Sequence, residues 1–150
     1  MRISREQMFM DIAEIVAKRS TCLRNNVGAI ITSEGNNIVS IGYNGVACGC
    51  THCTTETCVG KGCDLSLHAE WNAIMRTILS PQGDYSLYVT VSPCKRCALL
   101  ISQRNIKRVY YRYQYRDRSG IDLLLNKGVK VYRVLPSGEI IEEELEWQGK

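Results

Sequence analysis

Two short segments of the sequence carry residue types that together can bind and use a metal ion. His68 and Glu70 flank a single alanine, and Cys94 and Cys97 form a C-x-x-C pair directly after Pro93. A catalytic zinc site takes three protein ligands and leaves one position open for water. His68, Cys94 and Cys97 supply such a ligand set, which leaves the Glu70 carboxylate available to move protons. The pattern therefore predicts a zinc site with a proton-transfer group beside it.

Each half of this pattern has a simpler interpretation when it is taken alone. C-x-x-C pairs also occur in thiol redox sites and in structural zinc knuckles, and a His-Ala-Glu triplet can arise by chance. The combination favours catalysis, because both halves stand where helices are expected to begin and the chain has only 2 histidines. The arrangement H-x-E…P-C-x-x-C is the signature of zinc deaminases. A non-catalytic zinc module that binds nucleic acid is the alternative, and it leaves Glu70 without a role.

The composition is that of a soluble globular protein. The 150 residues are 45% hydrophobic and 23% charged, which suits a single domain with its own core. The sequence has no apolar run of the roughly 18 residues that a membrane span needs, and its first residues lack the apolar stretch of a secretory signal. We therefore expect a cytoplasmic protein with no membrane partner. In that setting the 8 cysteines favour metal binding or free thiols over disulfides.

The net charge of +4 is mild but unevenly distributed. Basic residues gather within residues 104–118, and glutamates gather within residues 139–146. Both stretches can be solvated surfaces of a folded domain. Alternatively, the basic stretch attracts anionic nucleotides.

The pattern of apolar residues predicts one α/β domain over residues 1–150. Ser4 is the expected N-cap of a first helix whose apolar face carries Met8, Ile12, Ile15 and Val16. The other expected helices and strands, in chain order, are strands 27–32 and 38–43, helix 68–80, strand 86–91, helix 93–104, strand 107–111, helix 117–126 and strand 129–135. This order predicts a three-layer α/β/α fold with a five-stranded mixed sheet, in a core of about residues 5–135 with an acidic C-terminal tail over 136–150.

The sequence resembles the cytidine deaminase superfamily and, within it, the deoxycytidylate (dCMP) deaminases of bacteria and phages. The resemblance extends from about Arg5 to Val134 and implies the cytidine-deaminase-like α/β/α fold. The motifs that carry it are residues 20–24 (STCLR), 27–29 (VGA), 42–45 (GYNG), 67–74 (LHAEWNAI) and 92–97 (SPCKRC).

The resemblance implies zinc-dependent hydrolysis of dCMP to dUMP and ammonia, which supplies dUMP for thymidylate synthesis. Zinc held by His68, Cys94 and Cys97 lowers the pKa of its bound water. Glu70 takes that proton, passes it to N3 of cytosine, and then protonates the departing amino group. Deaminases of cytidine, deoxycytidine or bases within nucleic acid are the alternatives. The absence of a strongly basic terminal extension speaks against nucleic acid, and the GYNG motif followed by a long cysteine-rich loop speaks against the free nucleoside.

The same resemblance implies a set of substrate contacts. Asn44 holds the sugar 3′-hydroxyl, the backbone at Ala69 contacts the pyrimidine carbonyl, and the backbone near Ser92 faces the amino group. Asn44 also suits a turn before the following glycine, which is the structural alternative. Tyr115 occupies the position of a substrate-binding tyrosine.

The phosphate of the substrate requires cationic donors. Arg24 is the first candidate and Arg112 the second. The alternative for both is an exposed surface arginine.

The cysteines of the chain also match a second, structural zinc site of bacterial and phage relatives. The matching positions are Cys22, Cys53, Cys58 and Cys63. Four thiolates make a closed tetrahedral site that would hold the long loop over residues 44–65. The spacing of the last of these cysteines to His68 is about one residue longer than in the relatives, so the substitutes are Cys48, Cys50 and His52. Reduced free thiols are the alternative.

The resemblance further implies a homo-oligomer, often a hexamer, with dCTP as activator, dTTP as inhibitor and Mg²⁺ accompanying these nucleotides. Relatives often have a proline soon after the GYNG motif, in the loop that takes part in this regulation. Here the chain reads VACG over residues 46–49. This departure from the pattern of the relatives argues against the allosteric response, whereas the expectation of an oligomer does not depend on it.

Overall fold

One mixed sheet forms the centre of the molecule. The computed structural model describes residues 1–48, 52 and 66–146. The sheet has six strands in the order β2-β1-β5-β6-β7-β8. These strands are β1 (Gly28–Ser33), β2 (Ile38–Tyr43), β5 (Tyr85–Val91), β6 (Ile106–Tyr113), β7 (Lys130–Val134) and β8 (Ile140–Glu142). β5, β6 and β7 run parallel, and the remaining neighbours in the sheet pair antiparallel. A separate pair consists of β3 (Gly45–Val46) and β4 (Ser66–Leu67).

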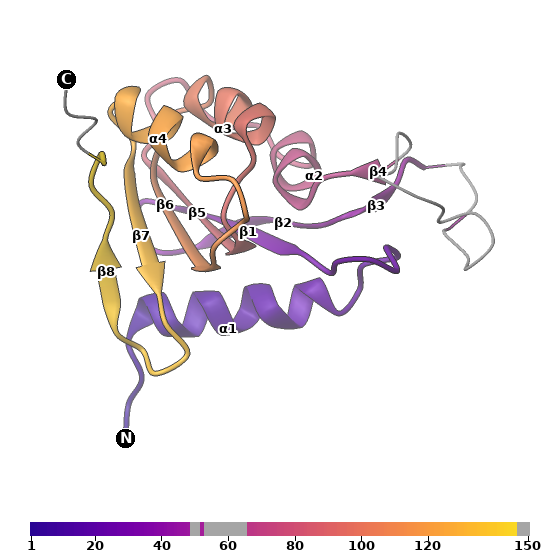
Figure 1. The fold of residues 1–150 in the computed structure, drawn as a ribbon, viewed down its shortest axis with the longest axis horizontal. Helices are drawn as coiled ribbons and strands as arrows, with labels where there is room; N and C mark the ends of the chain where they lie inside the picture. Colours follow the sequence, from indigo (N-terminus) through magenta and orange to yellow (C-terminus); the bar gives the residue numbers. More distant parts are fainter. Residues whose placement is uncertain (49–51, 53–65, 147–150) are drawn as a thin grey trace.

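Helices cover both faces of this sheet. α1 (Arg5–Ala17) lies along one face, and the other three helices lie on the opposite face (Figure 1). They are α2 (Ala69–Met75), α3 (Lys95–Ser102) and α4 (Ser119–Asn126). The predicted α/β/α class is confirmed. Among the described residues, no helix combines the length and the apolar character that crossing a membrane would need.

The core divides into two clusters because strand side chains alternate between the faces of a sheet. Ile30 and Tyr88 belong to the cluster beneath α1. Their chain neighbours Ile31 and Val89 belong to the cluster beneath the other three helices. Each strand therefore contributes to both sides, which explains the nearly continuous apolar runs in β1 and β5.

The first helix begins as predicted and packs Ile12 and Val16 of the expected face against the core, but the rest of its buried face differs. Ser4 is its N-cap, and the Ser4 hydroxyl accepts a hydrogen bond from the backbone N–H of Gln7 at 3.1 Å. Met8 and Ile15 were expected in the core, yet they are 40% and 64% exposed. Phe9 and Met10 are buried in their place, at 2% and 0% exposed. The apolar residues of this helix lie on more than one face, so periodicity alone did not select the buried one.

The predicted count of five strands is wrong because the segment assigned to the acidic tail contains β8. The backbone turns back after β7 through a bond from the Leu135 N–H to the Glu139 carbonyl at 2.9 Å. Gly138 has a φ of +94°, which favours glycine at this turn. β8 is short and fully exposed, so it carries no hydrophobic pattern from which to predict a strand.

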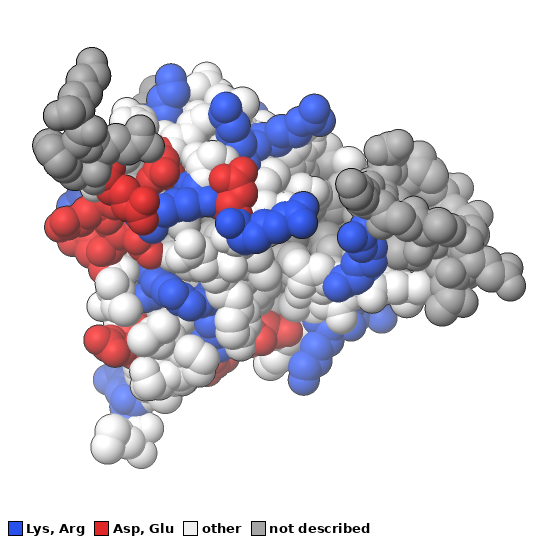
Figure 2. Space-filling model, in the orientation of Figure 1, with Lys and Arg blue, Asp and Glu red and all other residues white. Residues whose placement is uncertain are grey.

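Several charges of the basic and acidic stretches neutralise one another within the fold. Arg118 of the basic stretch forms ion pairs with Glu143 at 2.9 Å and Glu146 at 3.5 Å, both in the acidic stretch. Arg108 of the basic stretch is paired instead with Asp84, which precedes β5. Figure 2 shows the acidic side chains gathered at the end of the molecule where β8 lies, with basic side chains beside them. The basic and acidic stretches are therefore partly paired with each other and are not two separate solvated surfaces.

Several loops meet at one edge of the sheet. Because β5 and β6 are parallel, both end there, with Val91 opposite Tyr113. β1 is antiparallel to β5 and begins at the same edge, where Gly28 pairs with Tyr43 at the end of β2. This edge is therefore where side chains from distant parts of the sequence can act together.

α4 approaches the loop before α3 as closely as backbone atoms allow. A Cβ placed on Gly120 would lie 2.0 Å from the carbonyl oxygen of Pro93 and 2.9 Å from the carbonyl carbon of Cys94. Both neighbours are backbone atoms, so a side chain at residue 120 can be accommodated only by moving the segment that carries Cys94.

We therefore expect Gly120→Ala to lower both the melting temperature and the zinc content of the purified protein. Gly128→Ala is the matched control at the other end of α4. Gly128 has a φ of +81° and open space around its Cβ position, so its substitution strains the helix end without moving the Cys94 loop. Thermal unfolding and metal analysis of both variants test this. Full zinc content in Gly120→Ala would contradict it.

Candidate active site and metal centre

Three potential metal ligands converge at this edge of the sheet. His68 stands at the N-cap of α2 and Cys94 at the N-cap of α3, and Cys97 follows one turn later in α3. The Nδ1 atom of His68 lies 3.2 Å from Cys97 Sγ and 3.5 Å from Cys94 Sγ. The three ligand atoms all lie within 4.8 Å of one another. Pro93, expected in the first turn of α3, instead precedes the N-cap.

This cluster fits the donor set of a tetrahedral zinc ion. Zinc binds imidazole nitrogen and thiolate sulfur at about 2.0–2.3 Å, so its ligands lie roughly 3.5–4 Å from one another. An N-cap side chain ordinarily bonds the first backbone N–H groups of its helix. His68 and Cys94 make no such capping bond, and both cysteines are free thiols. Their donor atoms are therefore available for a metal.

The charge state of the sulfurs also suits a metal. The hydrogen bond with the Cys97 thiol, assisted by one with His68, lowers the pKa of Cys94 to about 4 against the opposing effect of burial. Cys94 is therefore a thiolate at neutral pH, and the thiolate is the form that binds metals. The pKa of Cys97 is raised by its hydrogen bond to Cys94 and by burial. A bound cation opposes that increase and favours a second thiolate.

Glu70 lies beside this cluster but is not one of its members. Its side chain is 4% exposed, and it belongs to the first turn of α2. Burial raises the pKa of the Glu70 carboxyl above its ordinary value. A buried carboxyl with a raised pKa can exchange protons with a reactant near neutral pH.

α2 packs closely on the sheet because residue 42 of β2 is a glycine and has no side chain to separate the two backbones. A Cβ on Gly42 would lie 2.4 Å from the carbonyl oxygen of Ala69, so glycine lets the start of α2 rest directly on β2. Asn72 reinforces this contact by donating from Nδ2 to the Tyr43 carbonyl at 2.8 Å. The GYNG motif thereby fixes the helix that carries Glu70.

A cavity of about 560 Å³ opens beside the cluster. This volume lies within the range of small-molecule sites. The sequence-predicted residues that line it are Cys22, Arg24, Asn44, His68, Ala69, Glu70, Ser92, Cys94 and Tyr115. Cys97 is fully buried behind them. Segments between residues 22 and 116 thus contribute to one cavity.

Asn44 is held in place through both ends of its amide. Its Oδ1 accepts from the Val27 N–H at 2.8 Å, and its Nδ2 donates to the Asn25 carbonyl at 2.6 Å. Both partners belong to the segment directly before β1, so these bonds join Asn44 to a distant part of the chain and are not those of a turn at residue 44. The second hydrogen on Nδ2 remains available to a ligand, because an amide nitrogen carries two hydrogens. A structural role and a binding role are therefore compatible at this residue.

Ser92 joins the loop before α3 to the loop after β6. Its backbone N–H donates to the Tyr113 carbonyl at 2.9 Å, and its hydroxyl accepts from the Tyr115 N–H at 2.6 Å. Tyr115 also lines the cavity. The guanidinium of Arg116 lies over the Tyr115 ring, 5.8 Å from its centre.

The second phosphate candidate, Arg112, is wrong. Its side chain is 6% exposed and pairs with Asp11 of α1 at 3.0 Å, on the opposite face of the sheet. Arg24 does line the cavity. Sequence reasoning missed the cavity-lining residues Asn25, Val27, Ser66, Val91, Tyr113, Gln114 and Arg116. The place of Arg116, three residues past the end of β6, was the signal that could have identified it.

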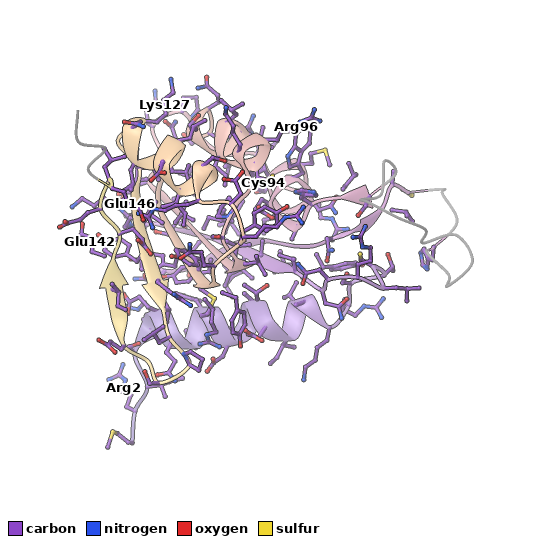
Figure 3. All side chains as sticks on the ribbon, in the orientation of Figure 1. Arg2, Cys94, Arg96, Lys127, Glu142 and Glu146 are labelled. Atoms are coloured by element: carbon purple, nitrogen blue, oxygen red, sulfur yellow. The ribbon has the colours of Figure 1, made fainter. Side chains whose placement is uncertain are left out.

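Most of the predicted second metal site lies outside the described residues. This applies to Cys50, Cys53, Cys58 and Cys63. Cys22 is half-buried and lines the cavity, while Cys48 and His52 are exposed. Figure 3 shows the labelled Cys94 near the centre of the molecule.

Comparisons with known proteins agree with this geometry. The deoxycytidylate deaminase of Schizosaccharomyces pombe is 35% identical over 90% of this chain, and ComE operon protein 2 of Bacillus subtilis is 38% identical over 89%. The chain spans 45% of the first relative and 72% of the second. A crystal structure of the dCMP deaminase from cyanophage S-TIM5 in complex with dCMP and dUMP has a TM-score of 0.77 and 34% identity. That match covers 89% of this chain and 98% of the phage chain.

A family model makes the assignment over most of the domain. The model for the cytidine and deoxycytidylate deaminase zinc-binding region matches residues 3–113. That span includes the metal cluster and Glu70, and it stops at the end of β6. The chain therefore belongs to the cytidine and deoxycytidylate deaminase family.

Proposed function

We propose that this protein deaminates dCMP by hydrolysis, forming dUMP and ammonia. The observation that carries the proposal is one His and two Cys ligands beside a buried carboxyl in a nucleotide-sized cavity. The dCMP and dUMP bound to the related phage deaminase support cytosine nucleotide as the substrate.

The proposed chemistry divides between a metal and one carboxyl group. Zinc held by His68, Cys94 and Cys97 supplies a Lewis acid that activates water near neutral pH. Glu70 accepts a proton from that water and delivers a proton to N3 of the cytosine ring, which makes C4 electrophilic. The hydroxyl oxygen then bonds to C4. Glu70 takes the remaining proton from that hydroxyl and transfers it to the amino group, so that the C4–N bond breaks, ammonia leaves and the oxygen becomes the C4 carbonyl. Water supplies the oxygen of dUMP, and the carboxylate is regenerated.

The cavity walls provide the contacts that this substrate requires. Asn44 is proposed to donate its remaining Nδ2 hydrogen to the sugar 3′-hydroxyl. The backbone at Ala69 faces the pyrimidine carbonyl and that at Ser92 faces the amino group. Tyr115 packs against the substrate, and Arg24 forms an ion pair with its phosphate. The placement of all five residues on the cavity supports these roles.

We further propose a second, structural zinc held by Cys22 with Cys53, Cys58 and Cys63. The resemblance to bacterial and phage relatives supports this site, as does the position of Cys22 at the cavity wall. An ion there would hold the cysteine-rich loop against the substrate site.

Assembly and regulation are also proposed by resemblance: a hexamer in the cytoplasm, activated by dCTP and inhibited by dTTP with Mg²⁺. The exposed apolar face of α2 supports an oligomer. On this face Trp71 and Met75 are 37% and 58% exposed, and Ile78 beyond the helix end is 95% exposed.

The substrate assignment predicts a preference among cytosine compounds. We expect ammonia release from dCMP with a kcat/KM about 100-fold or more above that for deoxycytidine, because the phosphate adds charge-assisted hydrogen bonds with Arg24 that the nucleoside cannot make. The assay compares dCMP, deoxycytidine, dCTP and single-stranded DNA. A preference for deoxycytidine or DNA would replace the proposal with a nucleoside or nucleic-acid deaminase.

The role of Glu70 predicts a variant that binds zinc without turning over substrate. Glu70→Gln keeps the size of the buried side chain, so we expect full zinc content and a kcat lower by about 10²–10⁴-fold. His68→Ala is the comparison and should lose the metal as well as the activity. Near-normal turnover by Glu70→Gln would remove this residue from the mechanism.

The second zinc predicts a metal stoichiometry. Elemental analysis should give two zinc ions per chain for the wild type and one for Cys22→Ser, because three thiolates hold a structural ion less well than four. One ion per chain in the wild type would exclude the structural site.

A further inference from the structure

The loop between β6 and α4 forms one wall of the substrate cavity. Its residues Gln114, Tyr115 and Arg116 line that cavity together with Tyr113 at the end of β6. Near its start the loop is bonded to Ser92, as described above. What holds its other end determines where Tyr115 and Arg116 lie relative to a bound nucleotide.

Arg118 holds that other end. Its guanidinium, 18% exposed, donates to Glu143 Oε2 at 2.9 Å and to the Glu144 carbonyl at 2.7 Å. Asp122 and Glu146 lie close to its Nε, at 3.3 and 3.5 Å. The guanidinium thus faces several carboxylates, and the partner that is itself well shielded from solvent is Glu143.

Glu143 connects this arginine to the core. Its side chain is 15% exposed, and its second oxygen accepts a hydrogen bond from the hydroxyl of the fully buried Tyr111. Its backbone N–H donates to the Val131 carbonyl of β7 at 2.8 Å. One carboxylate therefore joins the C-terminal segment, the sheet and the end of the cavity loop. In Figure 3 the labelled Glu142 and Glu146, which flank it in sequence, lie on the side of the molecule occupied by β8.

We propose that Glu143 is a positioning residue for the substrate cavity. It acts through Arg118, whose place at the end of the loop sets the position of Tyr115 and Arg116. The inference rests on the proposed function and adds to it, because Glu143 touches no substrate. It also lies beyond residues 3–113 that the family model matches, so it concerns a part of the chain that the family assignment does not reach.

Glu143→Gln tests this with little change of shape. An amide carries no charge, so its single oxygen can offer Arg118 only a neutral and weaker hydrogen bond, even if its NH2 group donates to the Tyr111 hydroxyl. Losing one charge-assisted hydrogen bond changes an equilibrium by about tenfold or more. We therefore expect KM for dCMP to rise about tenfold, with kcat within about twofold of wild type and zinc content unchanged.

The reciprocal variant Arg118→Gln should give a similar rise in KM. The double variant should rise no further than the larger single effect, because both changes break the same link. Arg118→Lys keeps the charge but loses the forked geometry, so it should give a smaller rise and serves if the glutamine variants do not fold.

Asp84→Asn is the matched control. Asp84 is paired with Arg108, another partly buried ion pair, but it lies before the start of β5, at the opposite end of that strand from the cavity. This variant should lower the melting temperature without changing KM. A KM within twofold of wild type for Glu143→Gln and Arg118→Gln would overturn the inference and leave Glu143 a merely structural residue.

The activity of the wild-type protein toward dCMP tests the proposed function separately from this inference. If the wild type does not deaminate dCMP, the proposed function fails. Calorimetric binding of dCMP to the same variants still measures the link from Glu143 to the cavity. Weaker binding by about tenfold supports the link, and unchanged binding contradicts it.

Discussion

The whole site depends on two helices that begin at the same edge of the sheet with unused N-cap side chains. His68 and Cys94 have the extended backbone of N-cap residues, yet neither caps its helix. Their donor atoms face one point, and Cys97 reaches it from one turn further along α3. Because the backbone fixes both helix starts, the ligand atoms are held together before a metal arrives. Such pre-organisation lowers the entropic cost of binding an ion.

That convergence requires close packing around it. Gly42 lets α2 rest on β2, and Gly120 lets α4 rest on the Pro93 carbonyl, so the metal ligands are held from two sides by backbone contacts. The parallel pairing of β5 with β6 then brings Ser92 and the loop after Tyr113 to the same place. Glu70 becomes buried as a consequence of this packing, and burial is what raises its pKa.

The sequence was sufficient to predict the clustering of His68, Cys94 and Cys97 and the fold class, because short spacing and apolar periodicity report on local structure. Prediction from the sequence failed where the role of a residue depends on which face of the sheet its side chain occupies. Arg112 and Arg116 are both basic residues of one stretch, but Arg112 lies on the α1 face of β6 and Arg116 on the cavity loop. β8 is exposed and short, so hydrophobicity gives it no signal. Glu143, the residue after β8, makes a long-range link to Arg118 that no local pattern encodes.

The central claim is that one ion binds between His68, Cys94 and Cys97 while Glu70 remains uncoordinated. Anomalous diffraction at the zinc absorption edge, from crystals of the purified protein, tests it most directly. The account predicts a peak bonded to His68 Nδ1 and both sulfurs, with the Glu70 carboxyl nearby but beyond bonding distance. A disulfide between Cys94 and Cys97, or a zinc ion ligated by Glu70, would contradict it.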